Sequence, residues 1–337
     1  MRVSVVTPIY NNEEYLRDCL ESLIRQTYGD IEYIFIDDGS TDKSFNIVKD
    51  YGNYPNVKIM SNTYNLGIVS AYKEAVKAAT GDILCFLDAD DIAHKDRVSR
   101  VVEEFQKDSN VGIVYSAMEL IDKNGESYNL FARLPSYVTN DNLFFQLFRR
   151  NFFTGSALAI RNYDWLKFDL NDIICCDYYL CLQIAEKGLK FSYIDEPLVK
   201  YRIHGKNTSN NSKRMFQSVI SVQNQYPYSY LQERWVNEGY SHEEILTSFG
   251  IMEYYYRKNE EQALKYFLAA DDGGSKDENT YFYLGCIYFK KGDLKKSYFY
   301  FNKAFEIAPQ RFQIVHNLGI LTCMYLRDIE KGRNLLQ

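Results

Sequence analysis

Short apolar runs rich in β-branched residues alternate with amphipathic segments along residues 1–91. The runs have the length of strands, and the apolar positions between them recur at helical spacing. Pro8 is expected to end the first strand, because proline cannot donate to a sheet ladder. Repeated strand and helix units predict an α/β fold, with a mostly parallel sheet and helices on both of its faces. The predicted strands are residues 3–7, 31–36, 57–60 and 83–87, and the predicted helices carry residues 16–24, 45–51 and 71–79.

The fourth predicted strand runs directly into acidic residues, Asp88, Asp90 and Asp91. Side chains alternate along a strand, so Asp88 and Asp90 can point the same way at the carboxyl edge of the sheet, where open α/β sheets bind ligands. Two carboxylates held together repel each other, and a divalent cation that bridges a diphosphate would relieve the repulsion. A solvated acidic loop or a helix cap is the simpler alternative for so short a motif.

The pattern is looser over residues 92–205. An aromatic and basic stretch at residues 144–153 fits either the protein core or a membrane-surface or lipid-acceptor contact. Asp177 stands at the start of a predicted helix, where a carboxylate is favourable and where a plain N-cap is the simplest role. The other predicted elements are a helix at 96–107, strands at 111–115, 154–160 and 198–202, a hairpin around Asn124-Gly125 and a helix at 175–188.

The C-terminal third of the chain has a different pattern. Residues 206–240 predict a linker with one helix near 212–223, and residues 241–337 repeat themselves at a spacing of 34 residues. The aligned pairs are Tyr254 with Tyr288, Ala263 with Ser297, Phe267 with Phe301 and Ala270 with Ala304. This spacing resembles tetratricopeptide repeats, which are stacked helix pairs. Gly250 departs from the pattern, because an apolar residue is expected there. The repeats are expected either to bury the flank of the first domain or to bind a protein partner or a second copy.

Composition narrows the classes of function. A length of 337 residues suits about two domains, and a net charge of −6 gives no electrostatic reason to bind nucleic acid. The seven cysteines are scattered without a C-x-x-C pair, which is typical of buried thiols in a reducing compartment. No apolar run approaches the roughly 18 residues of a membrane span. We therefore expect a cytoplasmic protein with at most peripheral contact at the inner face of the membrane.

Several short motifs occur in an order and spacing that resemble the inverting family 2 glycosyltransferases, which have the A-type nucleotide-sugar fold. The resemblance covers roughly residues 1–205, the predicted first domain. The chain departs from the family at Tyr72-Lys73, where many members carry Arg-Asn, and at Cys176, where the usual residue is Glu. The motifs are Val5-Val6-Thr7-Pro8-Ile9-Tyr10-Asn11, Ile36-Asp37-Asp38-Gly39-Ser40-Thr41-Asp42, Asn65-Leu66-Gly67, Phe86-Leu87-Asp88-Ala89-Asp90-Asp91, Thr154-Gly155-Ser156, Cys176-Asp177 and Tyr201-Arg202-Ile203-His204.

The resemblance implies a role for each matching residue. Asp38 would accept a hydrogen bond from the uracil of a UDP-sugar, and Asp88 would bind the ribose. Asp90, with His204, would hold Mn²⁺ or Mg²⁺, and Asp177 would be the general base that activates an acceptor hydroxyl. The residues expected to line the rest of the nucleotide-sugar site are Thr7, Pro8, Tyr10, Asn65, Gly67 and Ala89.

These roles predict an inverting glycosyltransferase that moves a hexose or N-acetylhexosamine from a UDP-sugar to a glycan, a lipid-linked sugar or a glycoprotein. A sugar-nucleotide pyrophosphorylase has a related nucleotide fold, but it opens with a glycine-rich phosphate loop. The corresponding loop here, Thr7 to Asn11, contains no glycine. A non-catalytic partner that binds through its helical repeats is the remaining alternative, and Asp38, Asp88, Asp90 and Asp177 argue against it.

Overall fold

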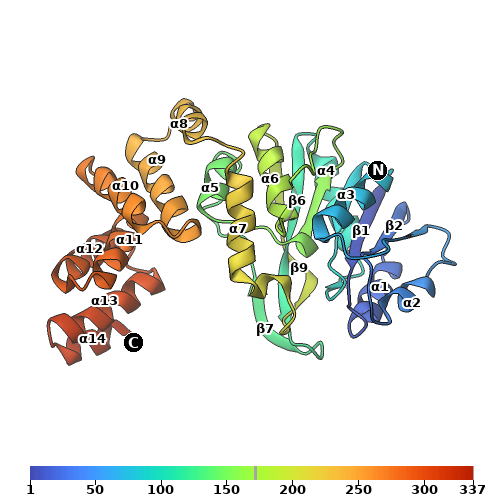
Figure 1. The fold of residues 1–337 in the computed structure, drawn as a ribbon, viewed down its shortest axis with the longest axis horizontal. Helices are drawn as coiled ribbons and strands as arrows, with labels where there is room; N and C mark the ends of the chain where they lie inside the picture. The colour runs from blue at the N-terminus through green and yellow to red at the C-terminus, as the bar shows by residue number, and fades with distance from the viewer. Residues whose placement is uncertain (171–172, 337) are drawn as a thin grey trace. The chain divides into compact units, whose positions relative to one another are not determined.

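The computed structural model describes residues 1–170 and 173–336, and the chain divides into two compact units at Val222 and Gln223 (Figure 1). The first unit is α/β and the second is all-α, which confirms the predicted fold class. The elements of the first unit are β1 (Val3–Ile9), α1 (Leu16–Ile24), β2 (Ile31–Asp37), α2 (Ser44–Lys49), β3 (Val57–Ser61), α3 (Ile68–Ala78), β4 (Ile83–Phe86), β5 (Ile92–Ala93), α4 (Arg97–Lys107), β6 (Val111–Ile121), β7 (Ser127–Ala132), α5 (Leu143–Arg149), the 3₁₀ turn η1 (Gly155–Ala157), β8 (Leu158–Arg161), α6 (Cys176–Glu186), β9 (Lys190–Arg202), the 3₁₀ turn η2 (Thr208–Asn210) and α7 (Ser212–Gln223).

One nine-stranded sheet forms the first unit, in the order β3-β2-β1-β4-β8-β6-β9-β5, with β7 paired to β6. The pairs among β1 to β4 are parallel, as predicted. The whole sheet is mixed rather than mostly parallel, because β8 runs antiparallel to both β4 and β6, and β5 and β7 are antiparallel to their partners. The predicted strand at 154–160 is also shorter than expected, since η1 occupies its first half.

The direction of the crossovers places helices on both faces of the sheet. The connections from β1 to β2 and from β2 to β3 run one way along the sheet, and the connection from β3 to β4 runs back. Right-handed crossovers then place α1 and α2 on one face and α3 on the other. The contacts agree, since α1 packs against α2, whereas α3 packs against α6.

Pro8 does not end the first strand, contrary to the prediction. The strand continues to Ile9, and Pro8 pairs with Ile36 of β2. Val6 faces β4, because its carbonyl accepts from Leu87 N at 3.1 Å, and Ile9 faces β2, because its carbonyl accepts from Asp38 N at 2.8 Å. Backbone groups alternate along a strand, so Pro8 faces the β4 side, where β4 has already ended at Phe86. The missing N–H therefore costs no ladder bond.

The aromatic stretch at residues 144–153 packs into the core of the first unit. Phe144, Phe145, Phe148 and Phe153 are buried, the first three of them on α5. The five cysteines of this unit are buried free thiols, as predicted, whereas Cys286 and Cys323 of the second unit are half-buried. Within the described parts of the chain, every helix is too short or too polar to cross a membrane.

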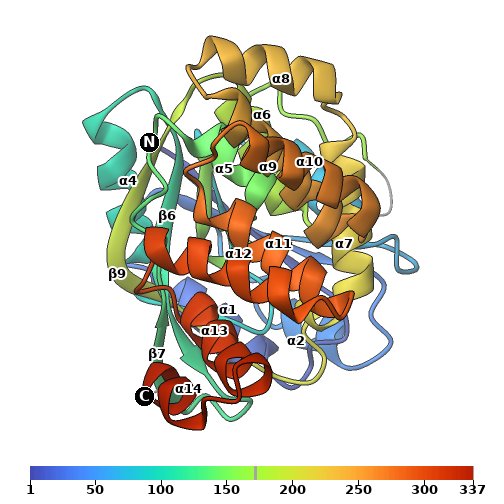
Figure 2. The same cartoon turned by 90° about the vertical axis from the view of Figure 1, so that its left-hand side faces the viewer.

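The second unit consists of helices that follow one another along the chain. Each helix from α9 onward packs against the next (Figure 2). Three helix pairs occupy the predicted repeat region, and their identity as tetratricopeptide repeats stays a prediction. The elements are α8 (Tyr228–Asn237), α9 (His242–Ile251), the π-helical turn η3 (Met252–Tyr256), α10 (Glu260–Asp272), α11 (Glu278–Lys290), α12 (Leu294–Ile307), α13 (Phe312–Tyr325) and α14 (Ile329–Leu336).

The π-helical turn explains why Gly250 departs from the repeat pattern. A Cβ at Gly250 would lie 2.5 Å from the Phe267 ring, and a Cβ at Gly285 would lie 2.9 Å from the Phe301 ring. The two glycines therefore have the same role, because each allows its helix to pack closely against a phenylalanine of the next helix. The two glycines are one residue farther apart in the sequence than the two phenylalanines are. The turn η3 accommodates this extra residue, since a π-helical turn holds one more residue than an α-helical turn.

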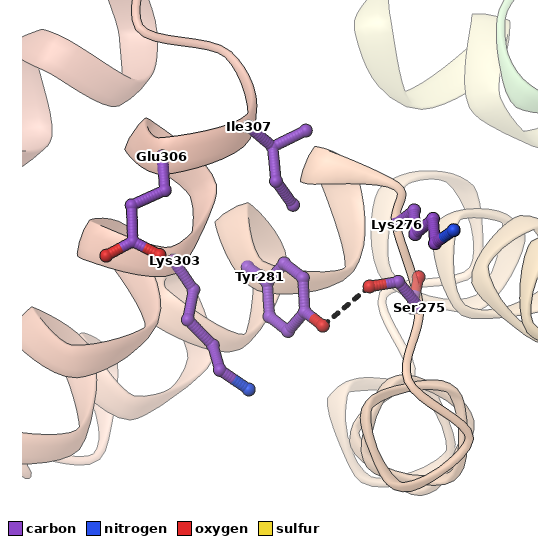
Figure 3. A pocket seen from close by; sticks show the side chains of 6 residues that line it. All are labelled: Ser275, Lys276, Tyr281, Lys303, Glu306 and Ile307. Atoms are coloured by element: carbon purple, nitrogen blue, oxygen red, sulfur yellow. Dashed lines mark hydrogen bonds between the residues drawn. The ribbon is translucent and has the colours of Figure 1, made fainter.

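A cavity of about 420 Å³ lies in the second unit (Figure 3). The Tyr281 hydroxyl donates to the Ser275 carbonyl at 2.7 Å, and Lys303 Nζ lies 2.7 Å from Asp271 Oδ1. None of the predicted site residues lines this cavity, because all of them belong to the first unit. The lining residues are Ser275, Lys276, Tyr281, Lys303, Glu306 and Ile307.

Candidate active site

The loops after β1 and β2 meet at the carboxyl edge of the sheet, where the predicted nucleotide residues lie. Asn11 N donates to Ser40 Oγ at 3.0 Å, so the first loop is tied to the second. Thr7 is fully buried, and its Oγ1 has no hydrogen-bond partner among the described residues. Pro8 is half-buried and the Tyr10 ring is exposed. These two loops therefore bring together residues that were predicted to contact the nucleotide.

Asp38 organises the loop that contains Asn65 and Gly67. Its Oδ1 accepts from Asn62 Nδ2 at 2.8 Å and from Leu66 N at 3.0 Å, and its Oδ2 accepts from Gly67 N at 2.8 Å. Asn65 Oδ1 also accepts from Gly67 N, at 2.9 Å. A carboxylate has about four acceptor positions, so one position on Oδ2 is left for a ligand N–H.

The acidic loop follows β4, and Asp88 is held in it by two neighbours. Asp88 N donates to Ser156 Oγ at 3.0 Å, and the Tyr72 hydroxyl donates to Asp88 Oδ1 at 3.2 Å. Burial, together with the carboxylates of Asp90 and Asp177, raises the pKa of Asp88 to about 7. Ala89 is buried between the two acids. The negative charge of Asp88 is therefore not balanced by its surroundings.

Asp90 and His204 face each other across the same edge. Asp90 Oδ2 lies 2.9 Å from His204 Nε2, although the residues are 114 positions apart in the sequence. The ring of His204 also lies 4.7 Å from the ring of Tyr15, centre to centre. Asp91 is buried, and its Oδ1 accepts from Arg202 N at 2.8 Å. Burial and the adjacent acids raise the pKa of Asp91 well above its ordinary value.

This donor set fits a divalent cation. Carboxylate repulsion is unrelieved at Asp88 and Asp91, and the buried Asp91 Oδ2 has no hydrogen-bond partner within residues 1–170 and 173–336. Within the same residues, no group of three or more His, Cys, Asp and Glu side chains forms a complete metal cage. Mg²⁺ and Mn²⁺ accept one or two carboxylates with substrate phosphates. Asp90 and His204 are therefore the residues that would hold a cation at this edge.

Asp177 lies in the first turn of α6, and it is not the cap of that helix. The N-cap is Cys175, which makes no side-chain cap bond. The Asp177 carboxylate accepts from Tyr178 N at 2.8 Å and from the backbone of Gly155. Burial raises its pKa to about 6. A Cβ at Gly155 would lie 3.9 Å from the Asp88 carboxylate, so Gly155 stands between the two acids.

Several residues of this edge were not predicted as site residues. Tyr72 and Ser156 hold Asp88, and Arg202 holds the acidic loop. Arg202 lies in the motif that ends at His204, and its place two residues before a predicted metal ligand was a signal that could have drawn attention to it. Tyr72 was noted only as a departure from the family motif, and a tyrosine at helical spacing otherwise looks like an ordinary core residue.

Comparison with known proteins places this geometry in a family. Residues 4–169 match the model for Glycosyl transferase family 2. The chain is 32% identical over 208 residues to the chondroitin synthase of Escherichia coli, an alignment that covers 61% of this chain and 30% of that protein. It is 30% identical over 246 residues to an uncharacterised glycosyltransferase of Nostoc sp., covering 68% of this chain and 76% of that protein. The chain spans only 21% to 30% of the length of the bacterial chondroitin and hyaluronan synthases that it matches.

Solved structures share the fold. S. aureus TarS 1-349, in complex with UDP-GlcNAc, superposes with a TM-score of 0.56 at 15% identity, covering 100% of this chain and 90% of TarS 1-349. The mannosyltransferase PcManGT from Pyrobaculum calidifontis, in complex with GDP-Man and Mn²⁺, superposes with a TM-score of 0.53 at 16% identity, covering 97% and 88%. The family match over residues 4–169 and the Nostoc relative show that the chain belongs to glycosyl transferase family 2.

Proposed function

We propose that the protein is an inverting glycosyltransferase that moves a hexose or N-acetylhexosamine from a UDP-sugar to a hydroxyl group. The observation that carries the proposal is the arrangement of Asp88, Asp90, His204 and Asp177 at one sheet edge, with a base whose pKa is raised to about 6. General bases work best when their pKa lies near the working pH. A non-catalytic partner protein would have no need for such a carboxylate.

Each residue has a chemical task in this proposal. Asp88 would accept from the ribose hydroxyls, and Asp90 with His204 would hold Mn²⁺ or Mg²⁺. When bound, the cation would neutralise charge on the leaving diphosphate. Asp177 would take the proton of the acceptor hydroxyl as that oxygen attacks the anomeric carbon from the face opposite the diphosphate. A single displacement of this kind inverts the anomeric configuration.

The acceptor would be a glycan, a lipid-linked sugar or a glycoprotein, in polysaccharide biosynthesis or protein glycosylation. We propose a cytoplasmic location with at most peripheral contact at the inner face of the membrane. The helical unit would offer a surface to a protein partner or to a second copy of the chain.

Release of nucleotide diphosphate from a panel of nucleotide sugars tests the proposal directly. The full chain should release UDP slowly from at least one UDP-sugar without an acceptor, and chelation of divalent cations should stop the release. GDP-mannose belongs in the panel, because the shared fold binds UDP-GlcNAc in TarS and GDP-Man in PcManGT. Release of GDP alone would correct the donor, and failure to bind or cleave any member would favour the non-catalytic alternative.

Asp38→Asn should weaken UDP binding roughly 10- to 100-fold, because a hydrogen bond from the uracil ring N–H to a charged acceptor is worth about 1.5–3 kcal/mol. Calorimetric titration with UDP and GDP would measure the loss. Asn62→Ala is the matched control, since it removes one donor to Asp38 but leaves the carboxylate in place. An equal loss for UDP and GDP, or the same loss in Asn62→Ala, would mean that Asp38 only orders the loop and does not read the base.

A further inference from the structure

Arg202, the last residue of β9, places a guanidinium group inside the protein beside the acidic loop. Its side chain is 1% exposed. Nε donates to the Asp90 carbonyl at 2.8 Å, Nη1 to the Lys123 carbonyl at 3.1 Å, and Nη2 to Asp18 Oδ2 at 3.2 Å. The three bonds point to three separate segments: the acidic loop, the turn between β6 and β7, and α1. Burying a guanidinium group is costly unless it is bonded in this way.

The main chain of Arg202 joins the same structure from the other side. Arg202 N donates to Asp91 Oδ1 at 2.8 Å, and the Arg202 carbonyl accepts from Asn207 Nδ2 at 2.9 Å. Asn207 Oδ1 in turn accepts from His204 N at 2.6 Å. The side chain of Arg202 therefore bonds the backbone of Asp90, and its main chain leads directly into the turn that carries His204.

The Tyr15 ring lies beside both Arg202 and His204. It lies 4.8 Å from Arg202 Cζ and 4.7 Å from the His204 ring, measured to ring centres. A ring face attracts a cation and also limits the motion of a flat neighbour. Arg202 and His204 thus both contact the Tyr15 ring, and His204 Nε2 lies 2.9 Å from Asp90 Oδ2.

We propose that Arg202 is a positioning residue that fixes Asp90 and His204 relative to each other, so that the two form a cation site before the donor binds. The inference rests on the proposed function, and it concerns a residue whose three side-chain hydrogen bonds are all to protein atoms. The planar fork of arginine is required, because lysine presents a single charged nitrogen and cannot reach three acceptors in fixed directions.

Mn²⁺ titration in the presence of UDP, followed by electron paramagnetic resonance, tests this role on the full chain. Arg202→Lys should weaken Mn²⁺ binding about 10- to 100-fold, the usual effect of losing a group that orients a metal ligand. UDP affinity without metal should stay within about threefold, and saturating Mn²⁺ should restore most of the turnover. A role in stability alone would lower the melting temperature without a selective loss of Mn²⁺ affinity.

Two further variants sharpen the test. Arg161→Lys is the matched control, because Arg161 also donates to main-chain carbonyls, those of Val111, Phe105 and Asp108, but away from the acidic loop. Its Mn²⁺ affinity should equal that of the wild type. Asn207→Ala loosens the His204 side of the same link without removing a buried charge, so it should weaken Mn²⁺ binding even if Arg202→Lys does not fold. The inference is overturned if folded Arg202→Lys keeps the Mn²⁺ affinity of the wild type. If Arg202→Lys does not fold, unchanged Mn²⁺ affinity in Asn207→Ala overturns it. A wild type that binds no Mn²⁺ instead overturns the metal-dependent function itself.

Discussion

Asp177→Asn will reduce sugar transfer by about two orders of magnitude or more while UDP-sugar affinity stays close to that of the wild type. A positioned carboxylate that accepts a hydroxyl proton in the transition state typically contributes 10²- to 10⁴-fold in rate. Asparagine can accept the hydrogen bond from Tyr178 N as the carboxylate does, but it cannot take a proton. Initial-rate kinetics with a saturating donor would measure the loss in turnover.

The raised pKa adds two checks on this variant. Wild-type turnover should fall as the pH falls through about 6, because the base becomes protonated. The folded-state pKa lies above the ordinary value of 3.8, so ionisation of Asp177 costs stability, fully above pH 6 and not at all near pH 3. Asp177→Asn should therefore be as stable as the wild type at acidic pH and more stable at pH 7–8, by roughly 1–3 kcal/mol. Thermal melts across this pH range would show the difference.

Asp169→Asn is the matched control for Asp177→Asn. The Asp169 carboxylate accepts from the Tyr179 hydroxyl of the same helix at 2.6 Å, so it is a neighbouring acid outside the site. Its turnover should match that of the wild type. Transfer within a few-fold of wild type in Asp177→Asn would instead assign the carboxylate to helix stability, and the base would have to be sought elsewhere at the sheet edge.

Asp90→Ala should abolish transfer and metal-dependent UDP binding while the fold survives. Asp90 lies in a loop, and its side chain is 17% exposed, so its loss opens no cavity in the core. His204 alone would remain of the pair, and a single imidazole is a weak site for Mg²⁺ or Mn²⁺, which prefer oxygen ligands. Calorimetry with UDP, with and without Mn²⁺, would separate loss of the cation from loss of the nucleotide.

Asp96→Asn provides the comparison for the metal experiment. Asp96 is an acid a few residues along the chain, and its Oδ1 accepts from Thr27 Oγ1 at 2.8 Å, away from His204. Transfer and Mn²⁺ dependence should be unaffected in this variant. Unchanged turnover in Asp90→Ala, or full wild-type activity in the presence of a chelator, would remove the cation from the mechanism.

The sequence predicted the first half of the sheet well, because β1 to β4 are apolar runs separated by helices with regular spacing. It also placed Asp88 and Asp90 at a strand end, since local alternation determines that. The later strands were harder, because β8 and β9 pair with strands far away in the sequence and their direction leaves no local pattern. Pro8 was misjudged for the same reason: its tolerance depends on where β4 ends.

The local sequence pattern could not predict the side-chain partners of the site residues either. Arg202 Nη2 meets Asp18 across 184 positions, and His204 meets Asp90 across 114. The order of motifs could indicate which residues share an edge. Only the folded chain shows that Tyr72 holds Asp88, that Asp38 binds the loop after β3, and that Asp177 lies within α6 and not at its cap.

The π-helical turn at Met252–Tyr256 bears on how the helical unit can change during evolution. One residue inserted into an α-helix rotates everything after it by about 100°, which would turn a buried face toward solvent. A π-helical turn absorbs the insertion locally, so Gly250 still faces Phe267 while Tyr254 keeps the repeat spacing to Tyr288. Repeats aligned at a rigid period will therefore score Gly250 as a mismatch, although in three dimensions it is the counterpart of Gly285.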